Sequence, residues 1–211
     1  MTEIEKIPWS GQLIAIQARI RLLRSFSERH HNYQGYVLRI KGICDNETRE
    51  FLIAVGKGAH EKNRFCSDMK LSGLSVSVSN PRLETAEYYK TSQIRIKKNS
   101  SDLPTQEPPY LGIPPDLNIY RSRGHRRLDP KTYQSKCLRC IWGCKMPVDI
   151  IIDHWNSSKR KYRFETFCYG PKSCPLYKAG VTRKVPGRKG MIWEEENWVD
   201  EDATFHRGLD D

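Results

Sequence analysis

The sequence predicts a mainly β protein with two β-rich modules, followed by a charged C-terminal segment. Three observations lead to this class. Alternating apolar and polar residues mark five short stretches between residues 8 and 98. A proline-rich segment follows near residue 100, where helix and central strand are both disfavoured. Beyond it, five of the seven cysteines fall between positions 137 and 174, around a predicted β-hairpin.

Residues 12–22 and 33–44 are the two longest predicted strands. Both alternate with a period of two, which is typical of a half-buried strand. In the second strand, Arg39 and Lys41 are expected to point away from the core. The inward positions expected in the first strand are Ile14, Ile16, Ala18, Ile20 and Leu22, and those expected in the second are Tyr36, Leu38 and Ile40.

Three further strands and one helix complete this module. We expect strands at residues 50–55, 71–79 and 91–97, and a short helix within residues 56–68. The inward positions expected in the last two strands are Leu74, Val76 and Val78, then Ile94 and Ile96.

The resulting order, β-β-β-α-β-β, resembles the OB-fold, a five-stranded and partly open Greek-key barrel. The resemblance covers residues 8–98 and rests on the long first strand, the helix before strand four and the ending PRLETAEYYKTSQIRI. It implies a single-stranded nucleic acid bound on the face of strands two and three, with bases on aromatic rings and phosphates on cations. Arg39 and Lys41 are the candidate contacts, and a merely solvated face is the alternative.

Residues 99–133 are predicted to form a linker and then a basic arm. Five prolines lie between positions 104 and 115, and proline both fixes φ and lacks an N–H donor. The sequence RSRGHRR at 121–127 then places four arginines in seven residues, which is typical of an arm that contacts phosphates. The candidate contacts are Arg123, Arg126 and Arg127, with a solvated loop as the alternative.

Residues 134–178 are predicted to form a metal-binding module. Cys137 and Cys140 form a C-x2-C turn, and Cys168 and Cys174 follow the predicted hairpin. Two thiolates from each side can bind one tetrahedral ion, which stabilises a module too small to build its own core. This arrangement resembles a zinc ribbon. The second pair is separated by five residues rather than two, and Cys144 is an alternative ligand.

Zinc is therefore the predicted cofactor, and an iron–sulfur cluster bound by four thiolates is the alternative. Unliganded buried thiols are a third interpretation. A catalytic zinc keeps an open coordination position, whereas enough cysteines are present here to close the site. No catalytic residue is assigned, because the sequence contains no P-loop, GxGxxG, GxSxG or HExxH motif.

The predicted hairpin of this module has a basic tip. Lys159, Arg160 and Lys161 are consecutive there, and aromatic residues flank them on both strands. Cations beside aromatic rings are typical of a surface that binds a nucleic-acid backbone or exposed bases. The aromatic residues can equally be the small core of the module, which leaves the three cations unexplained.

Charge is distributed unevenly along the chain. The whole chain has a net charge of +11, but residues 1–190 have +18 and residues 191–211 have −7. Residues 179–211 are predicted to be a flexible basic arm and acidic tail. The tail is a candidate contact for a protein partner, or a competitor for the nucleic-acid surface. In the second case, deleting residues 191–211 should tighten binding at low salt.

These features together predict a non-enzymatic, metal-containing protein that binds single-stranded DNA or RNA. The alternatives are a metal-dependent nuclease using Asp149, Asp153 and Glu165, or an acyl-CoA-binding or protein-interaction module built from the same two folds. No apolar stretch is long enough to span a bilayer and no export signal is present, so we expect a cytoplasmic protein without a membrane partner. An odd number of cysteines in that compartment argues against disulfides.

Overall fold

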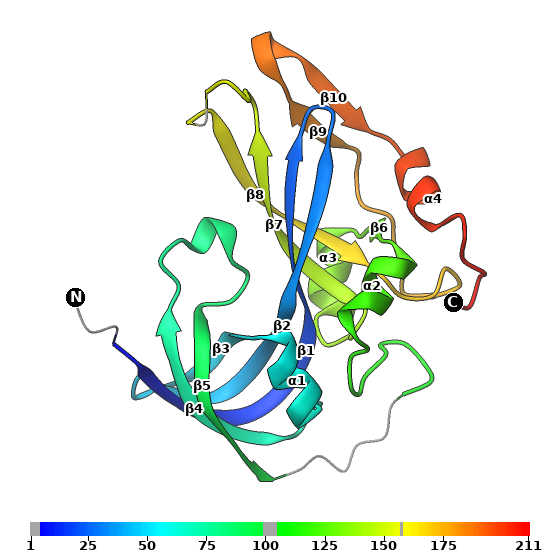
Figure 1. The fold of residues 1–211 in the computed structure, drawn as a ribbon. Coiled ribbons are helices and arrows are strands. Elements are labelled where there is room, and N and C mark those ends of the chain that lie inside the picture. Colours follow the sequence, from blue (N-terminus) through cyan, green and yellow to red (C-terminus); the bar gives the residue numbers. More distant parts are fainter. Residues whose placement is uncertain (1–4, 99–104, 157) are drawn as a thin grey trace.

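A computed structural model of the chain describes residues 5–98, 105–156 and 158–211 (Figure 1). The protein is mainly β, as the sequence predicts. The beginning of the predicted proline-rich linker, residues 99–104, lies outside the described residues. None of the helices in the described ranges is both long and apolar enough to cross a membrane.

Five strands and one helix form the N-terminal half, in the predicted order. The strands are β1 (Ile7–Ser25), β2 (Arg29–Cys44), β3 (Glu47–Val55), β4 (Lys70–Ser77) and β5 (Tyr88–Lys98), and the helix α1 (Lys57–Asn63) lies between β3 and β4. β1 pairs with both β2 and β4, and β5 connects β4 to β3, so the five strands close into a ring. A closed ring buries one face of every strand and leaves few free edges.

A β-bulge between Leu13 and Ala15 decides which side chains of β1 face the core. Leu13 is fully buried, whereas Ile14 is only half-buried, so the inward placement of Ile14 was wrong. The extra residue shifts the alternation by one position, and a sequence pattern does not reveal such a shift. The other inward positions predicted for β1 and β2 are all buried: Ile16, Ala18, Ile20, Leu22, Tyr36, Leu38 and Ile40.

The predicted inward face of β4 was also wrong. Leu71 and Ser75 are buried, whereas Leu74, Val76 and Val78 are half-buried. Two inward positions, Gly73 and Ser75, are small because they lie against the indole of Trp9, which donates to the Ser75 hydroxyl at 2.9 Å. On β5, Ile94 is half-buried and Ile96 is exposed.

The second half of the chain extends the same sheet. β7 (Gly143–Ile151) pairs in parallel with the C-terminal end of β1. β8 (Arg160–Cys168) pairs with β7, and the short β6 (Arg126–Arg127) pairs with β8 at the edge of the sheet. Figure 1 shows the long β1–β2 hairpin rising from the ring alongside β7 and β8. The ring and the cysteine-bearing hairpin are therefore joined through one continuous sheet.

Between the ring and β7 the chain forms short helical turns. They are α2 (Leu117–Arg123), α3 (Pro130–Thr132) and a π-helical turn at Tyr133–Cys137. The side chain of Asp129 accepts from the backbone N–H of Thr132 at 2.9 Å and so caps α3.

Residues 179–211 are structured rather than a flexible arm and tail. They form the hairpin β9 (Arg183–Pro186) and β10 (Ile192–Glu195), and then α4 (Trp198–Thr204). Two carboxylates of this segment are buried against body arginines: Glu195 accepts from Arg24 at 2.9 Å, and Asp200 accepts from Arg127 at 3.0 Å. The acidic composition thus has a structural use that sequence composition alone did not reveal.

Candidate metal centre and basic groove

The four cysteines favoured as ligands line one small pocket, called the cysteine pocket below. Cys137 ends the π-helical turn, Cys140 follows it, Cys168 ends β8 and Cys174 lies in the next turn. The cavity that they line, together with prolines, glycines and aromatic residues, has a volume of about 10 Å³. Tyr110, from the segment before α2, closes one side of the pocket.

The C-x2-C turn is held by the barrel strand β1. The amide of Gln17 donates to the carbonyl oxygens of Cys137 and Cys140 at 3.0 and 2.9 Å, and its oxygen accepts from the Tyr133 hydroxyl at 2.7 Å. Within the turn, the Cys140 N–H donates to the Cys137 carbonyl at 3.1 Å. A ring residue therefore positions the turn that carries two of the four thiols.

The surroundings of the sulfur atoms suit thiolates bound to a cation. Burial raises the pKa of Cys137 to about 11 and that of Cys140 to about 12, so without a positive partner both thiols stay protonated. Backbone N–H groups of Trp142 and Gly170 counter this effect at Cys140 and Cys168, because each donates to the sulfur two residues earlier. N–H donors aimed at sulfur stabilise a thiolate.

The donor set therefore fits zinc, which is commonly bound by four cysteine thiolates. As the side chains stand, no three His, Cys, Asp or Glu residues in the described ranges are grouped so that they could hold a metal ion. The zinc centre accordingly stays a prediction. Bound metal would supply a structural cross-link between the π-helical turn, the end of β8 and the turn at Cys174.

Cys144 lies outside the cysteine pocket. It is fully buried on β7, and its thiol donates to the Ala18 carbonyl on β1 at 3.4 Å. Burial raises the pKa of this thiol far above its usual value, which fits a neutral core side chain. The structure thus favours the interpretation in which Cys144 packs beneath the hairpin and does not bind metal.

A basic groove follows the outer edge of β8, and we call it the β8 groove. It is open, has a volume of about 430 Å³ and combines four cations with two aromatic rings. Three of the cations come from β8 itself, and the fourth comes from the 3-10 turn Pro81–Leu83 of the barrel. The lining residues with these properties are Arg82, Arg160, Lys161, Arg163, Tyr162 and Phe164.

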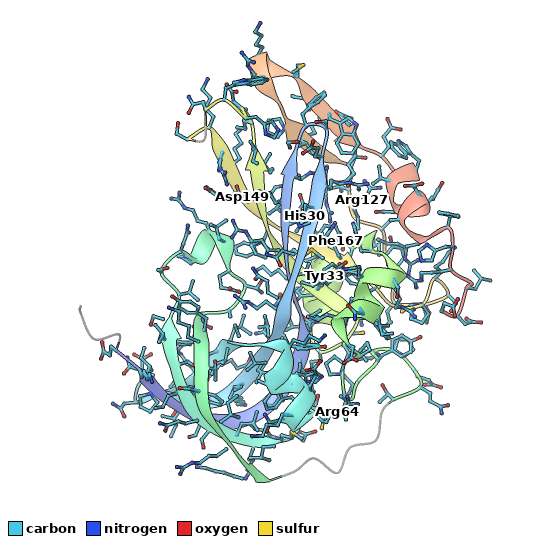
Figure 2. The ribbon with its side chains drawn as sticks, viewed as in Figure 1. His30, Tyr33, Arg64, Arg127, Asp149 and Phe167 are labelled. Atoms are coloured by element: carbon cyan, nitrogen blue, oxygen red, sulfur yellow. The ribbon has the colours of Figure 1, made fainter. Side chains whose placement is uncertain are left out.

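Two of these cations are fixed by carboxylates. Arg160 donates to Asp149 at 2.8 Å, and Arg163 donates to Glu165 at 2.5 Å. Asp149, labelled in Figure 2, is completely buried and also accepts from Arg21 at 2.9 Å. A guanidinium has five N–H donors, so Arg160 keeps donors for a ligand while its position is fixed. Arg163 also donates to the Lys184 carbonyl at 2.8 Å, and its remaining nitrogen is buried, so it contributes mainly its charge to the groove.

Lys161 is the exposed lysine of this groove, and within the described ranges it has no ion-pair partner. The predicted neighbour Lys159 is also exposed and lies 4.0 Å from the carboxylate of Asp153. The basic tip predicted from the sequence therefore exists, and its third member, Arg160, lines the same groove as Lys161.

The predicted basic arm is not a free arm. Arg127, labelled in Figure 2, is 0% exposed. It donates to Asp200, the Glu195 carbonyl and the Asn197 side chain. Arg126 is buried over the ring of Tyr177, with 3.8 Å from guanidinium to ring centre.

Arg123 is the third predicted contact of this arm. Its guanidinium donates to the Tyr169 carbonyl at 2.8 Å and lies 4.5 Å from the ring centre of Trp142. All three arginines cross-link the cysteine-bearing half internally, so we leave them out of the proposed contact surface.

The two barrel candidates lie in different places. Arg39 is half-buried, faces the contact between the ring and the π-helical turn, and lies 3.7 Å from Glu50. Lys41 is exposed on another part of the barrel, beside Gly11 and Gly42. The structure therefore does not bring Arg39, Lys41 and the β8 groove together into one site.

The three carboxylates considered for a nuclease are each bound by cations. Asp149 pairs with Arg21 and Arg160, and Glu165 pairs with Arg163 and Arg183. Asp153 lies within 4.0 Å of Lys159 and Arg188. Carboxylates that hold Mg²⁺ need free oxygens, so this arrangement gives no support to a two-metal site.

Two functional residues escaped the sequence analysis. Gln17 received no role from its place in the first predicted strand, although it organises the C-x2-C turn. Arg82 stands far from the hairpin in sequence and reaches the β8 groove only through the fold. No local sequence signal marks either role.

Comparison with known proteins adds no relative, since no protein-family model, no curated protein and no solved structure matches this chain.

Proposed function

We propose that the protein binds single-stranded nucleic acid without acting as an enzyme, and that zinc in the cysteine pocket stabilises it. The observation that carries this proposal is the β8 groove, in which Arg82, Arg160, Lys161 and Arg163 surround two aromatic rings. Phosphates are met by Lys and Arg, and unstacked bases stack on aromatic side chains.

The fold supports the same proposal. The ring order β1–β2–β3–β5–β4, with α1 between β3 and β4, is the arrangement expected of an OB-fold barrel. The second half, with paired cysteines on either side of a β-hairpin, matches the pattern of a zinc ribbon. We assign the protein to the cytoplasm, where the thiols remain reduced and available to zinc.

Binding of a fluorescein-labelled dT20 or U20 oligonucleotide, titrated at several salt concentrations, tests this function. Lys161→Gln combined with Arg82→Gln should weaken binding about tenfold at low salt and reduce the salt slope by about 0.7 for each phosphate that is no longer neutralised. The matched control is Lys131→Gln with Lys136→Gln, two exposed lysines outside the groove. Equal affinities for the two double variants, or no binding by the wild type at low salt, would contradict the proposal.

The same titration with Mg²⁺ present addresses the nuclease alternative. We expect the oligonucleotide to stay intact, because the carboxylates Asp149 and Glu165 are bound by arginines. Cleavage that Asp153→Ala abolishes would establish the alternative instead.

A further inference from the structure

A second basic surface lies on the barrel, on the outer face of four adjacent strands. β2, β1, β4 and β5 are neighbours in the ring, and Figure 1 shows β1 and β4 together at its base. Two open hollows of about 390 and 360 Å³ lie there side by side and share Ser10 and Ile43 in their walls. We call the two together the barrel groove.

The strand register places its side chains in two neighbouring rows. In the first row, Gln12 on β1 is opposite both Lys41 on β2 and Lys70 on β4. Partners in an antiparallel ladder lie on the same face of the sheet, so the two lysines flank Gln12. Lys97 on β5 lines the same hollow. Three separate strands thus bring one lysine each to one place.

The second row lies two residues along each strand. Ser10 is opposite Ile43 and Ser72, and Ser72 is opposite Arg95 on β5. This hollow is also lined by the amides of Asn46 and Gln93. An amide side chain is both donor and acceptor, which suits the edges of nucleobases, and the exposed Ile43 offers an apolar contact.

Within the part of the chain that the structure describes, the three lysines form no ion pair, unlike several other barrel cations. Arg19 is paired with Glu84, Arg49 with Glu87 and Lys57 with Glu61. Within the described ranges, no ion pair involves Lys41, Lys70 or Lys97, and all three are exposed. Two carboxylates lie nearby: Asp68 accepts from Gln12 at 2.6 Å, and Glu50, opposite Lys41 on β3, lies 3.7 Å from Arg39.

The floor of the groove is backbone. Gly11 and Gly42 are opposite each other where β1 and β2 cross closely. A Cβ on Gly11 would lie 2.5 Å from the Lys41 carbonyl oxygen, and a Cβ on Gly42 would lie 2.1 Å from that of Ser10. A side chain at either position would point to the face opposite Gln12 and Lys41, so the two glycines permit the close approach of β1 and β2 beneath the groove.

We infer that the barrel groove is a second binding site for single-stranded nucleic acid, separate from the β8 groove. Phosphates bind beside Lys41, Lys70 and Lys97, and bases bind beside Asn46, Gln93 and Arg95. The choice of ligand rests on the proposed function, because a row of unpaired lysines next to amide groups suits phosphates and base edges together.

The test compares two triple variants of the full chain in the dT20 titration. Lys41→Gln/Lys70→Gln/Lys97→Gln should weaken binding at least tenfold and lower the salt slope by about 2, which corresponds to three neutralised phosphates on a single strand. The control Lys57→Gln/Lys62→Gln/Lys131→Gln removes the same charge from exposed positions outside the groove and should keep most of the affinity. Equal weakening in both variants would overturn the inference.

A measurement on the unmodified protein avoids any effect of the substitutions on folding. Acetylation of lysines, read by mass spectrometry with and without dT20, should show Lys41, Lys70 and Lys97 protected by the oligonucleotide and Lys57 and Lys62 unaffected. Protection of Lys161 alone would overturn the second site and leave the proposed function intact, whereas no protection anywhere would count against both.

Inorganic polyphosphate as a competitor separates phosphate binding from base binding. Asn46→Ala/Gln93→Ala should weaken dT20 binding and leave polyphosphate binding unchanged. If both ligands respond equally to this variant, the groove does not recognise bases, and that part of the inference is wrong.

Discussion

Several arginines of this protein have buried side chains. Arg24 and Arg127 are almost inaccessible, and each is held by a carboxylate from the C-terminal segment. Removing both charges of a buried pair can be harmless, but removing one leaves the other charge buried without compensation. These pairs explain why the C-terminal segment adopts a fixed structure.

Asp200→Ala should therefore destabilise the protein by about 3 kcal/mol, the usual cost of breaking a buried ion pair. Arg127 would lack the acceptor for both its backbone N–H and its Nε atom. Chemical denaturation monitored by circular dichroism measures the change. Asp202→Ala is the matched control on the same helix, since Asp202 is exposed, and a similar destabilisation in both variants would contradict the assignment.

Two histidines with rings in contact make stability depend on pH. The rings of His31 and His125 lie 4.5 Å apart beside Phe167. Burial and the charges of Arg29 and Arg24 lower the pKa of His31 to about 4, and burial followed by His31 lowers the pKa of His125 well below its usual value. The folded protein therefore keeps both rings neutral at a pH where the unfolded chain protonates them.

The unfolded state binds more protons between about pH 4 and pH 6.5, so these groups stabilise the fold above that window and lose their effect as the pH falls through it. We expect the melting temperature to drop between pH 7 and pH 5, and His31→Gln to reduce that drop. His30→Gln is the control, because the neighbouring His30 is exposed. Identical pH profiles for wild type and His31→Gln would refute this explanation.

Among the elements, the turn at Cys137–Cys140 depends most clearly on a distant strand. Gln17→Ala removes two hydrogen bonds to this turn and the acceptor of Tyr133. Mutating a residue that orients a metal ligand through a hydrogen bond typically lowers metal affinity by about 10- to 100-fold. We expect a decrease of that size in zinc affinity, measured by competition with a chromophoric chelator.

Gln12→Ala provides the control for this prediction. Gln12 lies on the same strand and also points outward, but it binds Asp68 instead of the cysteine turn. Unchanged zinc affinity in Gln17→Ala, or one zinc per chain retained after Cys137→Ser and Cys168→Ser together, would argue against the metal centre as described.

The elements also show what sequence patterns can and cannot predict. The five barrel strands follow from alternation, which reports burial on one face of a strand. The facing of Ile14 did not follow, because a bulge shifts the alternation of β1. The facing of Leu74 did not follow, because the inward positions Gly73 and Ser75 carry no large apolar side chain that the pattern could reveal. The cysteine pocket was predictable from spacing, whereas the contribution of Arg82 to the β8 groove depends on pairing between distant segments.

At the scale of the whole molecule, the net charge of +11 conceals an internal neutralisation. Glu195 and Asp200 are used inside the protein, while Glu196, Glu201 and Asp202 remain exposed on the same segment. Two different effects of the acidic segment are therefore separable: its buried carboxylates stabilise the fold, and its exposed carboxylates act on approaching polyanions through the field they create.

Deleting residues 191–211 should accordingly destabilise the protein instead of simply tightening nucleic-acid binding, since the deletion removes β10 and the partners of Arg24 and Arg127.

The electrostatic effect of the exposed carboxylates is tested by Glu196→Gln/Glu201→Gln/Asp202→Asn, which keeps the buried ion pairs. We expect this variant to melt like the wild type and to bind dT20 about two- to threefold more tightly at about 10 mM salt, where screening extends over about 30 Å. At about 0.5 M salt the difference should vanish, because screening is then confined to a few ångströms. A gain that persists at high salt would instead indicate direct competition for a groove, and unchanged affinity at low salt would show that the segment acts only through its buried contacts.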